Sequence, residues 1–260
     1  MFMLAIFMDF PIQEQLIYKK ICNSAYNNTI CKHTELKKYK TEETYVQSHT
    51  STWMLYIKIA STFPSMLAVI ILGPCSDKIG RKFVMVLPLI GGCIGAAAMI
   101  VNAYYIHLHV SYMLIGSIIS GFFGNFAMVL MAVFSYMADI TTAKNRTLRV
   151  TILEAMVFVG GCLGEIVGGL MVDNVGFYVT FCVVLGVNAI NLLYVVICIP
   201  EVYFPEKKSS FSDVICNCKD VANAVVIFAK KRAGKQQRML VILLFSFFCS
   251  LIGKKQEIII

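Results

Sequence analysis

The sequence predicts an all-α membrane protein. Three observations support that class: an apolar composition, long apolar runs, and basic residues at the ends of those runs. Hydrophobic residues make up 58% of the 260 residues and charged residues only 15%, with a mean hydropathy of +0.74. Because soluble domains carry about 25% charged residues, the composition excludes an ordinary soluble protein. The formal charge of +8 does not indicate nucleic acid, since Lys and Arg form no single stripe with aromatic residues.

Runs long enough to cross a bilayer define the expected elements in order. A spanning helix needs about 20 apolar residues. Residues 1–18 lack the charged leader region of a signal peptide and are interpreted as the last part of a first span. Full spans are expected over 53–74, 84–106, 111–137, 150–172 and 177–199, and a further one at about 239–253. The predicted order is a partial span 1 (1–18), an extracellular loop (19–52), spans 2 to 6 (53–199), a cytoplasmic loop between bundles (200–238) and a partial span 7 (239–260).

Basic residues set the orientation, because loops rich in Lys and Arg stay on the cytoplasmic side. The loops that follow 53–74 and 111–137 are basic, as is the segment 200–238. The short loops around His107–His109 and Asp173–Gly176 contain no Lys or Arg. We therefore place the three basic segments in the cytoplasm and the two short loops outside.

The first loop, 19–52, is basic yet lies outside in this topology. Asn27-Asn28-Thr29 within it is an N-glycosylation sequon, which supports the outer placement and makes Asn27 the expected glycosylation site. A second sequon, at Asn145, falls on the cytoplasmic side and is expected to be unused. A seven-helix receptor would require the opposite orientation, and its Asp-Arg-Tyr and Asn-Pro-x-x-Tyr motifs are missing from the sequence, so it is the remote alternative.

A polar segment from Gly73 to Lys82 interrupts the apolar stretch and carries the spacing Gly-x-x-x-Asp-x-x-Gly-Arg-Lys. This spacing resembles the loop signature of the major facilitator transporters. The two glycines permit a tight turn, and the aspartate can accept hydrogen bonds from a helix N-terminus or pair with an arginine. The alternative is an ordinary basic connector. The predicted gating residues are Gly73, Asp77, Gly80, Arg81 and Lys82.

The same glycine and aspartate frame returns at Gly169–Gly176, where Phe177 and Tyr178 replace the basic pair. The repeat suggests two three-helix units of opposite orientation, an arrangement found in transporters. A chance match in glycine-rich spans is the alternative.

The span 150–172 has two faces. Gly160, Gly164 and Gly168 recur every four residues and predict a smooth stripe for helix packing. Glu154 and Glu165 lie within about 20° of each other and about a quarter turn from that stripe. Because a carboxylate in the bilayer costs about 2.5 to 3.5 kcal/mol unless it faces water or a partner, both are candidate functional groups. Lys58, by contrast, is expected to extend outward as a structural anchor.

Cysteines predict little chemistry. Cys22 and Cys31 lie in the outer loop and could bridge each other or pair elsewhere. Cys216 and Cys218 have no histidine nearby, so no metal site is expected, and no motif indicates a cofactor or an enzyme.

Together these residues resemble solute carrier family 46, which comprises the proton-coupled folate transporter and its thymic stromal cotransporter-like relatives. The resemblance rests on five segments: Gly73–Lys82, Arg146–Arg149 with Leu153–Ala155, Ile199–Glu201, Gln15–Tyr18, and Trp53 with Ala60–Ser65. It implies a major facilitator fold with an N-terminal six-helix bundle plus part of a seventh span, the chain being truncated to the N-terminal half.

The resemblance also implies a function: a proton-coupled symporter of organic anions or folate-like solutes, working by alternating access. It implies that Glu154 serves proton coupling, with Glu165 as the second candidate, and that Asp77 and Arg81 belong to a cytoplasmic gate. Ser117 and Asn125 replace an arginine and an aspartate that the folate transporter carries, so folate itself is not predicted.

The expected partners are a small organic solute, protons and the lipid bilayer. The plasma membrane is the expected location, with the endolysosomal membrane as the alternative. The rival function is a non-transporting truncated carrier. In either case the exposed face that bears Glu154 would meet lipid or a second copy in a homodimer.

Overall fold

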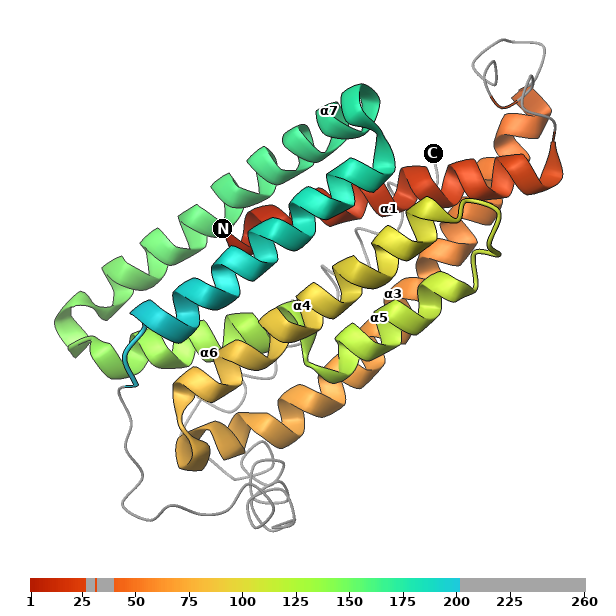
Figure 1. Cartoon of the computed structure of the whole chain (residues 1–260). Helices are drawn as coiled ribbons and strands as arrows, with labels where there is room; N and C mark the ends of the chain where they lie inside the picture. The colour runs from red at the N-terminus through yellow and green to blue at the C-terminus, as the bar shows by residue number, and fades with distance from the viewer. Residues whose placement is uncertain (27–30, 32–39, 202–260) are drawn as a thin grey trace, which may run out of the picture. The chain divides into compact units, whose positions relative to one another are not determined.

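The computed structural model describes residues 1–26, 31 and 40–201. All its regular elements within these residues are helices, which confirms the all-α prediction (Figure 1). The helices are α1 (Phe2–Ala25), α3 (Lys40–Ile79), α4 (Arg81–Tyr104), α5 (Tyr112–Phe122), α6 (Asn125–Ile140) and α7 (Ala143–Cys198). Asn27, the cysteines at 216 and 218 and the expected span within 239–260 lie outside the described residues.

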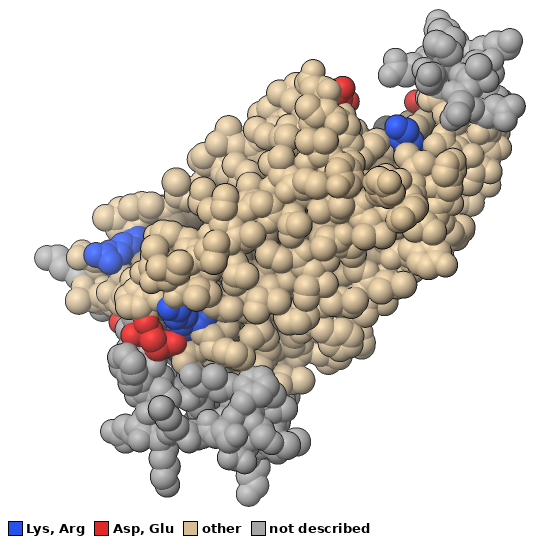
Figure 2. Space-filling view, in the orientation of Figure 1, with Lys and Arg blue, Asp and Glu red and all other residues tan. Residues whose placement is uncertain are grey.

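Four described stretches are long and apolar enough to cross a membrane: Lys40–Ser76, Arg81–Tyr104, Tyr112–Ile140 and Asn145–Cys198. Their outer surfaces expose large apolar side chains such as Phe63, Phe158 and Ile197. Figure 2 shows charged residues near two ends of the face in view, with a broad charge-free area between them. An apolar belt of this kind is what a bilayer covers.

The helix α7 reverses direction at Gly176, where the backbone has φ +82° (Figure 1). Gly80, the last glycine of the first frame, has φ +118° and separates α3 from α4. Only glycine adopts such positive φ values readily, so both frames end a helix with the residue that the turn requires. This correspondence supports the predicted inverted repeat, which stays a prediction.

The expected span 111–137 is broken into α5 and α6, a break that the continuous apolar run did not reveal. Gly124 is left-handed, with φ +88°. Its carbonyl accepts a hydrogen bond of 2.6 Å from Ser65 Oγ on α3. Asn125 Nδ2 donates to Ser61 Oγ, also on α3, at 2.7 Å. Side chains from α3 thus bind both residues at the break.

Helices α1 and α3 extend past the apolar runs that predicted them. α1 continues to Ala25, and α3 is 40 residues long with Glu42 and Glu43 in its first turn, where acidic residues favour a helix start. Hydropathy marks only the part of a helix that lies in lipid, so polar helix ends were missed. The Cys22–Cys31 disulfide, with a Cα–Cα distance of 5.9 Å, settles the pairing that the sequence left open.

The glycine stripe of α7 lies against α1. A Cβ added at Gly164 would come within 2.7 Å of Leu4 O, and one added at Gly168 within 2.9 Å of Met8 O. A Cβ added at Gly160 would lie 3.2 Å from the Cβ of Met3. The two helices therefore meet backbone to backbone, which small residues permit in membranes.

Candidate functional site

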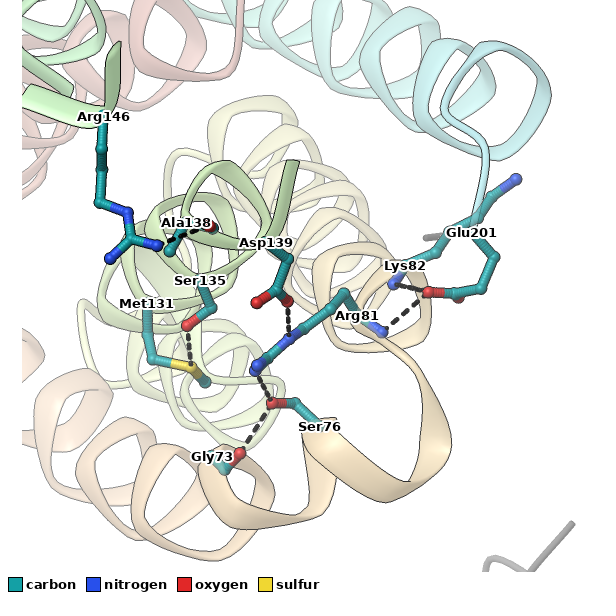
Figure 3. A network of polar contacts seen from close by, with 10 residues as sticks. All are labelled: Gly73, Ser76, Arg81, Lys82, Met131, Ser135, Ala138, Asp139, Arg146 and Glu201. Carbon is teal, nitrogen blue, oxygen red and sulfur yellow. Dashed lines mark hydrogen bonds and ion pairs between the residues drawn. The ribbon is translucent and has the colours of Figure 1, made fainter. Parts of the chain in front are cut away.

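Arg81 joins three helices at the end of the bundle that carries the basic loops (Figure 3). It is the first residue of α4, and its Nε lies 2.8 Å from Asp139 Oδ2 on α6. Its Nη1 donates to Ser76 Oγ on α3 at 2.7 Å. The side chains are 16% and 35% exposed, so solvent screens this ion pair less than one on an open surface.

Glu201 follows α7 and caps the N-terminus of α4 (Figure 3). Its Oε1 accepts from Arg81 N at 3.0 Å, and its Oε2 accepts from Lys82 N at 3.2 Å. A carboxylate at this position satisfies backbone donors that have no partner inside the helix and interacts favourably with the helix dipole. Gly80 allows the approach, because a Cβ there would lie 2.8 Å from Glu201 Oε2.

Two further contacts tie the end of α7 to its neighbours. Lys82 Nζ donates to Val196 O at 2.6 Å, and Tyr136 OH on α6 donates to Pro200 O at 3.2 Å. We call Arg81, Asp139, Ser76 and Glu201 the latch. It links α3, α4, α6 and the residue after α7 at one end of the bundle.

Only some of the predicted gating residues take part in the latch or touch it. Arg81, Lys82 and Gly80 belong to the latch or touch it. Gly73 contributes its carbonyl, which accepts from Ser76 Oγ at 2.8 Å, but a Cβ at Gly73 would meet nothing closer than Met131 Cε at 3.9 Å. The side chain of Asp77 lies outside the described residues.

A cavity of about 280 Å³ lies halfway along the bundle. Its wall on α4 runs from Pro88 to Met99, in the middle of that helix, and its wall on α3 runs from Ile57 to Thr62. Helices α1, α5, α6 and α7 complete it. Asp9 and Lys58 are the only charged residues among the described residues that line it. The uncharged polar lining consists of Gln13, Ser61, Thr62, Ser117, Ser120, Asn125 and Asn188.

Asp9 is held from its own helix and attracted from α3. Gln13 Nε2, one turn along α1, donates to Asp9 Oδ2. Lys58 on α3 attracts Asp9 electrostatically, and its Nζ lies 3.2 Å from the centre of the Phe10 ring. Lys58, expected to extend outward as an anchor, is exposed as a residue, and it also lines the cavity.

Glu154 and Glu165, the predicted proton-coupling pair, lie elsewhere. Both are exposed on the first half of α7 and neither lines the cavity. They share a face of α7 that no described helix covers, whereas the glycine stripe of the same helix is covered by α1.

The sequence pattern described as the Major Facilitator Superfamily matches residues 25–255. The chain belongs to the major facilitator superfamily. This membership indicates a transporter protein rather than an enzyme, and with the apolar helices it makes the chain a multi-pass membrane protein.

The proteins that this chain is similar to include members of solute carrier family 46, the family predicted from the sequence. The proton-coupled folate transporter of Bos taurus is 30% identical over 60% of this chain and 34% of its own length. The lysosomal proton-coupled steroid conjugate and bile acid symporter SLC46A3 of Gallus gallus is 26% identical over 91% of this chain and 53% of its own length. The proton-coupled folate transporter of Rattus norvegicus is 26% identical over 88% of this chain. The chain spans about half the length, or less, of these relatives.

Sequence reasoning missed the roles of several residues in this major facilitator chain. In the sequence Glu201 stands out only through a family resemblance, and Asp139 carries no signal. Asp9 could have been found, because the argument that a carboxylate inside an apolar run needs a partner applies to it as well as to Glu154. Lys58 was noted inside its span but interpreted as an anchor, because nothing in the sequence pairs it with Asp9.

Proposed function

We propose that this chain forms one helical bundle of a proton-coupled carrier of organic anions that works by alternating access. The observation that carries the proposal is the latch at one end of a bundle whose polar cavity lies halfway along its helices. In carriers of this kind a central site faces one side at a time, while bundles rock around it. A bond network at one end that links several helices can stabilise one of those states.

The orientation supports a cytoplasmic latch. Four basic residues lie near the latch in the sequence or in the fold: Arg81, Lys82, Arg146 and Arg149. Arg146 Nη2 donates to Ala138 O, next to Asp139, at 3.1 Å (Figure 3). Basic residues of this density stay on the inner side of a membrane. Closing the latch would therefore seal the cytoplasmic end and leave the cavity open outward.

The solute class rests on the relatives and on the cavity. Two relatives are named for folate and one for steroid conjugates and bile acids, solutes that carry anionic groups on ring systems. The cavity offers one cation, Lys58, among aromatic and small polar side chains. Its volume of about 280 Å³ lies at the small end of ligand sites, so this bundle would hold one end of such a solute.

Glu154 remains our candidate for proton coupling, with Glu165 second. Because both are exposed on α7, they would act only where another bundle or a second copy covers that face. The plasma membrane is the proposed location, with the endolysosomal membrane as the alternative.

Uptake measurements test this proposal. Labelled folate, glycocholate and estrone sulfate are offered to cells that express the gene encoding this chain, in acidic and in neutral medium. We expect saturable uptake of at least one anion, stimulated by acid and abolished by a protonophore. Uptake of all three that equals that of cells without the gene would contradict the proposal and favour a non-transporting protein.

A further inference from the structure

The ammonium of Lys58 lacks hydrogen-bond acceptors in the cavity. No described residue accepts a hydrogen bond from its Nζ, although an ammonium has three protons to donate. Its Nζ lies over the face of the Phe10 ring, 3.2 Å from the ring centre. Asp9 and Glu14 attract it electrostatically. Lys58 can therefore accommodate a further anion.

Asp9 also keeps a free position. Gln13 occupies its Oδ2, whereas its Oδ1 is buried and has no hydrogen-bond partner among the described residues. Asn188 Oδ1, in the lining contributed by α7, is likewise buried without a donor among the described residues. A buried acceptor without a donor is unfavourable. Among the described residues, one oxygen of the Asp9 carboxylate thus has no donor and the Lys58 ammonium has no hydrogen-bond acceptor.

Few other charges act on this pair. Glu14 lies on α1, is exposed and does not line the cavity. The described lining residues of α4, α5, α6 and α7 are all uncharged. A change of charge on Lys58 or Asp9 must therefore be balanced within the pair or by what enters the cavity.

We infer that Asp9 and Lys58 form an exchange site, in which the anionic group of an organic solute binds Lys58 while Asp9 takes up one proton. The inference rests on the proposed function and adds to it a binding residue and a second proton site, distinct from Glu154 and Glu165. In the empty cavity Asp9 and Lys58 neutralise each other. When a carboxylate or sulfate of the solute binds the Lys58 ammonium, Asp9 shares its counterion with a second anion.

Charge balance then favours protonation of Asp9. A carboxylate out of water is unfavourable without a counterion, and a neighbouring anion makes it more so. One proton from the aqueous side binds Oδ1, the oxygen that Gln13 leaves free. The cavity holds no net charge before binding (Asp9 negative, Lys58 positive) and none afterwards (Asp9 neutral, Lys58 positive, solute group negative). One proton thus enters for each anionic group bound.

Binding measured together with proton uptake tests the exchange site without transport. The purified full chain in weakly buffered detergent is titrated with folate, glycocholate and estrone sulfate, and a pH indicator records protons while calorimetry records binding. We expect about one proton to be taken up for each anionic group bound near neutral pH. Absence of binding by all three anions, or binding without proton uptake, would overturn the inference.

Variants assign the two roles. Asp9→Asn should still bind the anion but take up no proton, and Lys58→Gln should bind at least tenfold more weakly. Lys58→Arg keeps the positive charge and should keep both binding and proton uptake, which guards against loss of the fold as an explanation. Glu14→Gln is the matched control, because Glu14 also attracts Lys58 but lies outside the cavity, and it should behave as the wild type.

The outcomes separate this inference from the proposed function. Wild-type proton uptake in Asp9→Asn, or unchanged anion binding in Lys58→Gln, contradicts the exchange site even where cells accumulate the anion. Proton-linked binding that depends on both residues, in a protein whose cells accumulate nothing, supports the site and contradicts the carrier.

Discussion

Arg81 Nε and Asp139 Oδ2 lie 2.8 Å apart and connect the start of α4 to the end of α6. Ser76 on α3 binds the same guanidinium, and Glu201 after α7 binds the backbone amide of the same residue. One arginine thus receives contacts from three other segments of the chain. A residue in this position can stabilise the closed arrangement of the bundle end.

Loss of the ion pair should open this end. We expect Asp139→Asn to weaken the latch by about 1 kcal/mol, because an amide keeps the shape of the carboxylate but not its charge. Cys75, one residue before Ser76, is 2% exposed and reports the opening. Its labelling by a thiol reagent in inside-out vesicles, followed by mass spectrometry, should accelerate in Asp139→Asn.

Arg149→Gln is the control for this measurement, because Arg149 is an exposed cation near the same end. Equal labelling of Cys75 in both variants would show that the ion pair does not hold the end closed.

The contact of α1 with the glycine stripe predicts a stability difference between two glycines of α7. Gly164→Ala should lower the free energy of unfolding by about 1 to 3 kcal/mol, because its Cβ would meet a backbone carbonyl that cannot turn away. Gly169→Ala meets nothing within 4 Å and should be neutral or stabilising, since Ala favours a helix over Gly by about 1 kcal/mol. Thermal unfolding of both purified variants measures the difference, and the same loss in both would exclude the close contact as its cause.

Glu154→Gln should abolish acid-stimulated uptake and preserve exchange of preloaded solute, because a neutral amide resembles the protonated carboxyl. Uptake at several external pH values and exchange at one pH separate the two activities in the expressing cells. Asp173→Asn, which neutralises an exposed carboxylate at the reversal of α7, should leave both unchanged. A wild-type pH profile in Glu154→Gln would remove Glu154 from the coupling mechanism.

Glycosylation tests the orientation. Translation with microsomes should add one glycan at Asn27 and none at Asn145, and Asn27→Gln should remove the mass shift. A glycan on Asn145 alone would invert the topology and place the latch on the outer side.

Hydropathy predicted the class and most helix positions because lipid demands long apolar runs. It missed the break between α5 and α6, since Gly124 and Asn125 lie in a run that is apolar on both sides. Hydrogen bonds with another helix stabilise that break: Ser61 on α3 accepts one from Asn125, and Ser65 donates one to Gly124. The motif at Gly73–Lys82 located one half of the latch, but it contained no information on Asp139 or on the capping role of Glu201.

The sequence by itself determined the membrane class, the orientation expected from the basic loops, and the superfamily. These properties depend on composition and local spacing. Only the tertiary structure decided that Asp9 and Lys58 line one cavity while Glu154 and Glu165 lie outside it. A helix in lipid is apolar on its outer and inner faces alike, so hydropathy does not show which side turns inward. That rotation is set by contacts between distant segments, such as the approach of Leu4 and Met8 to the glycines of α7.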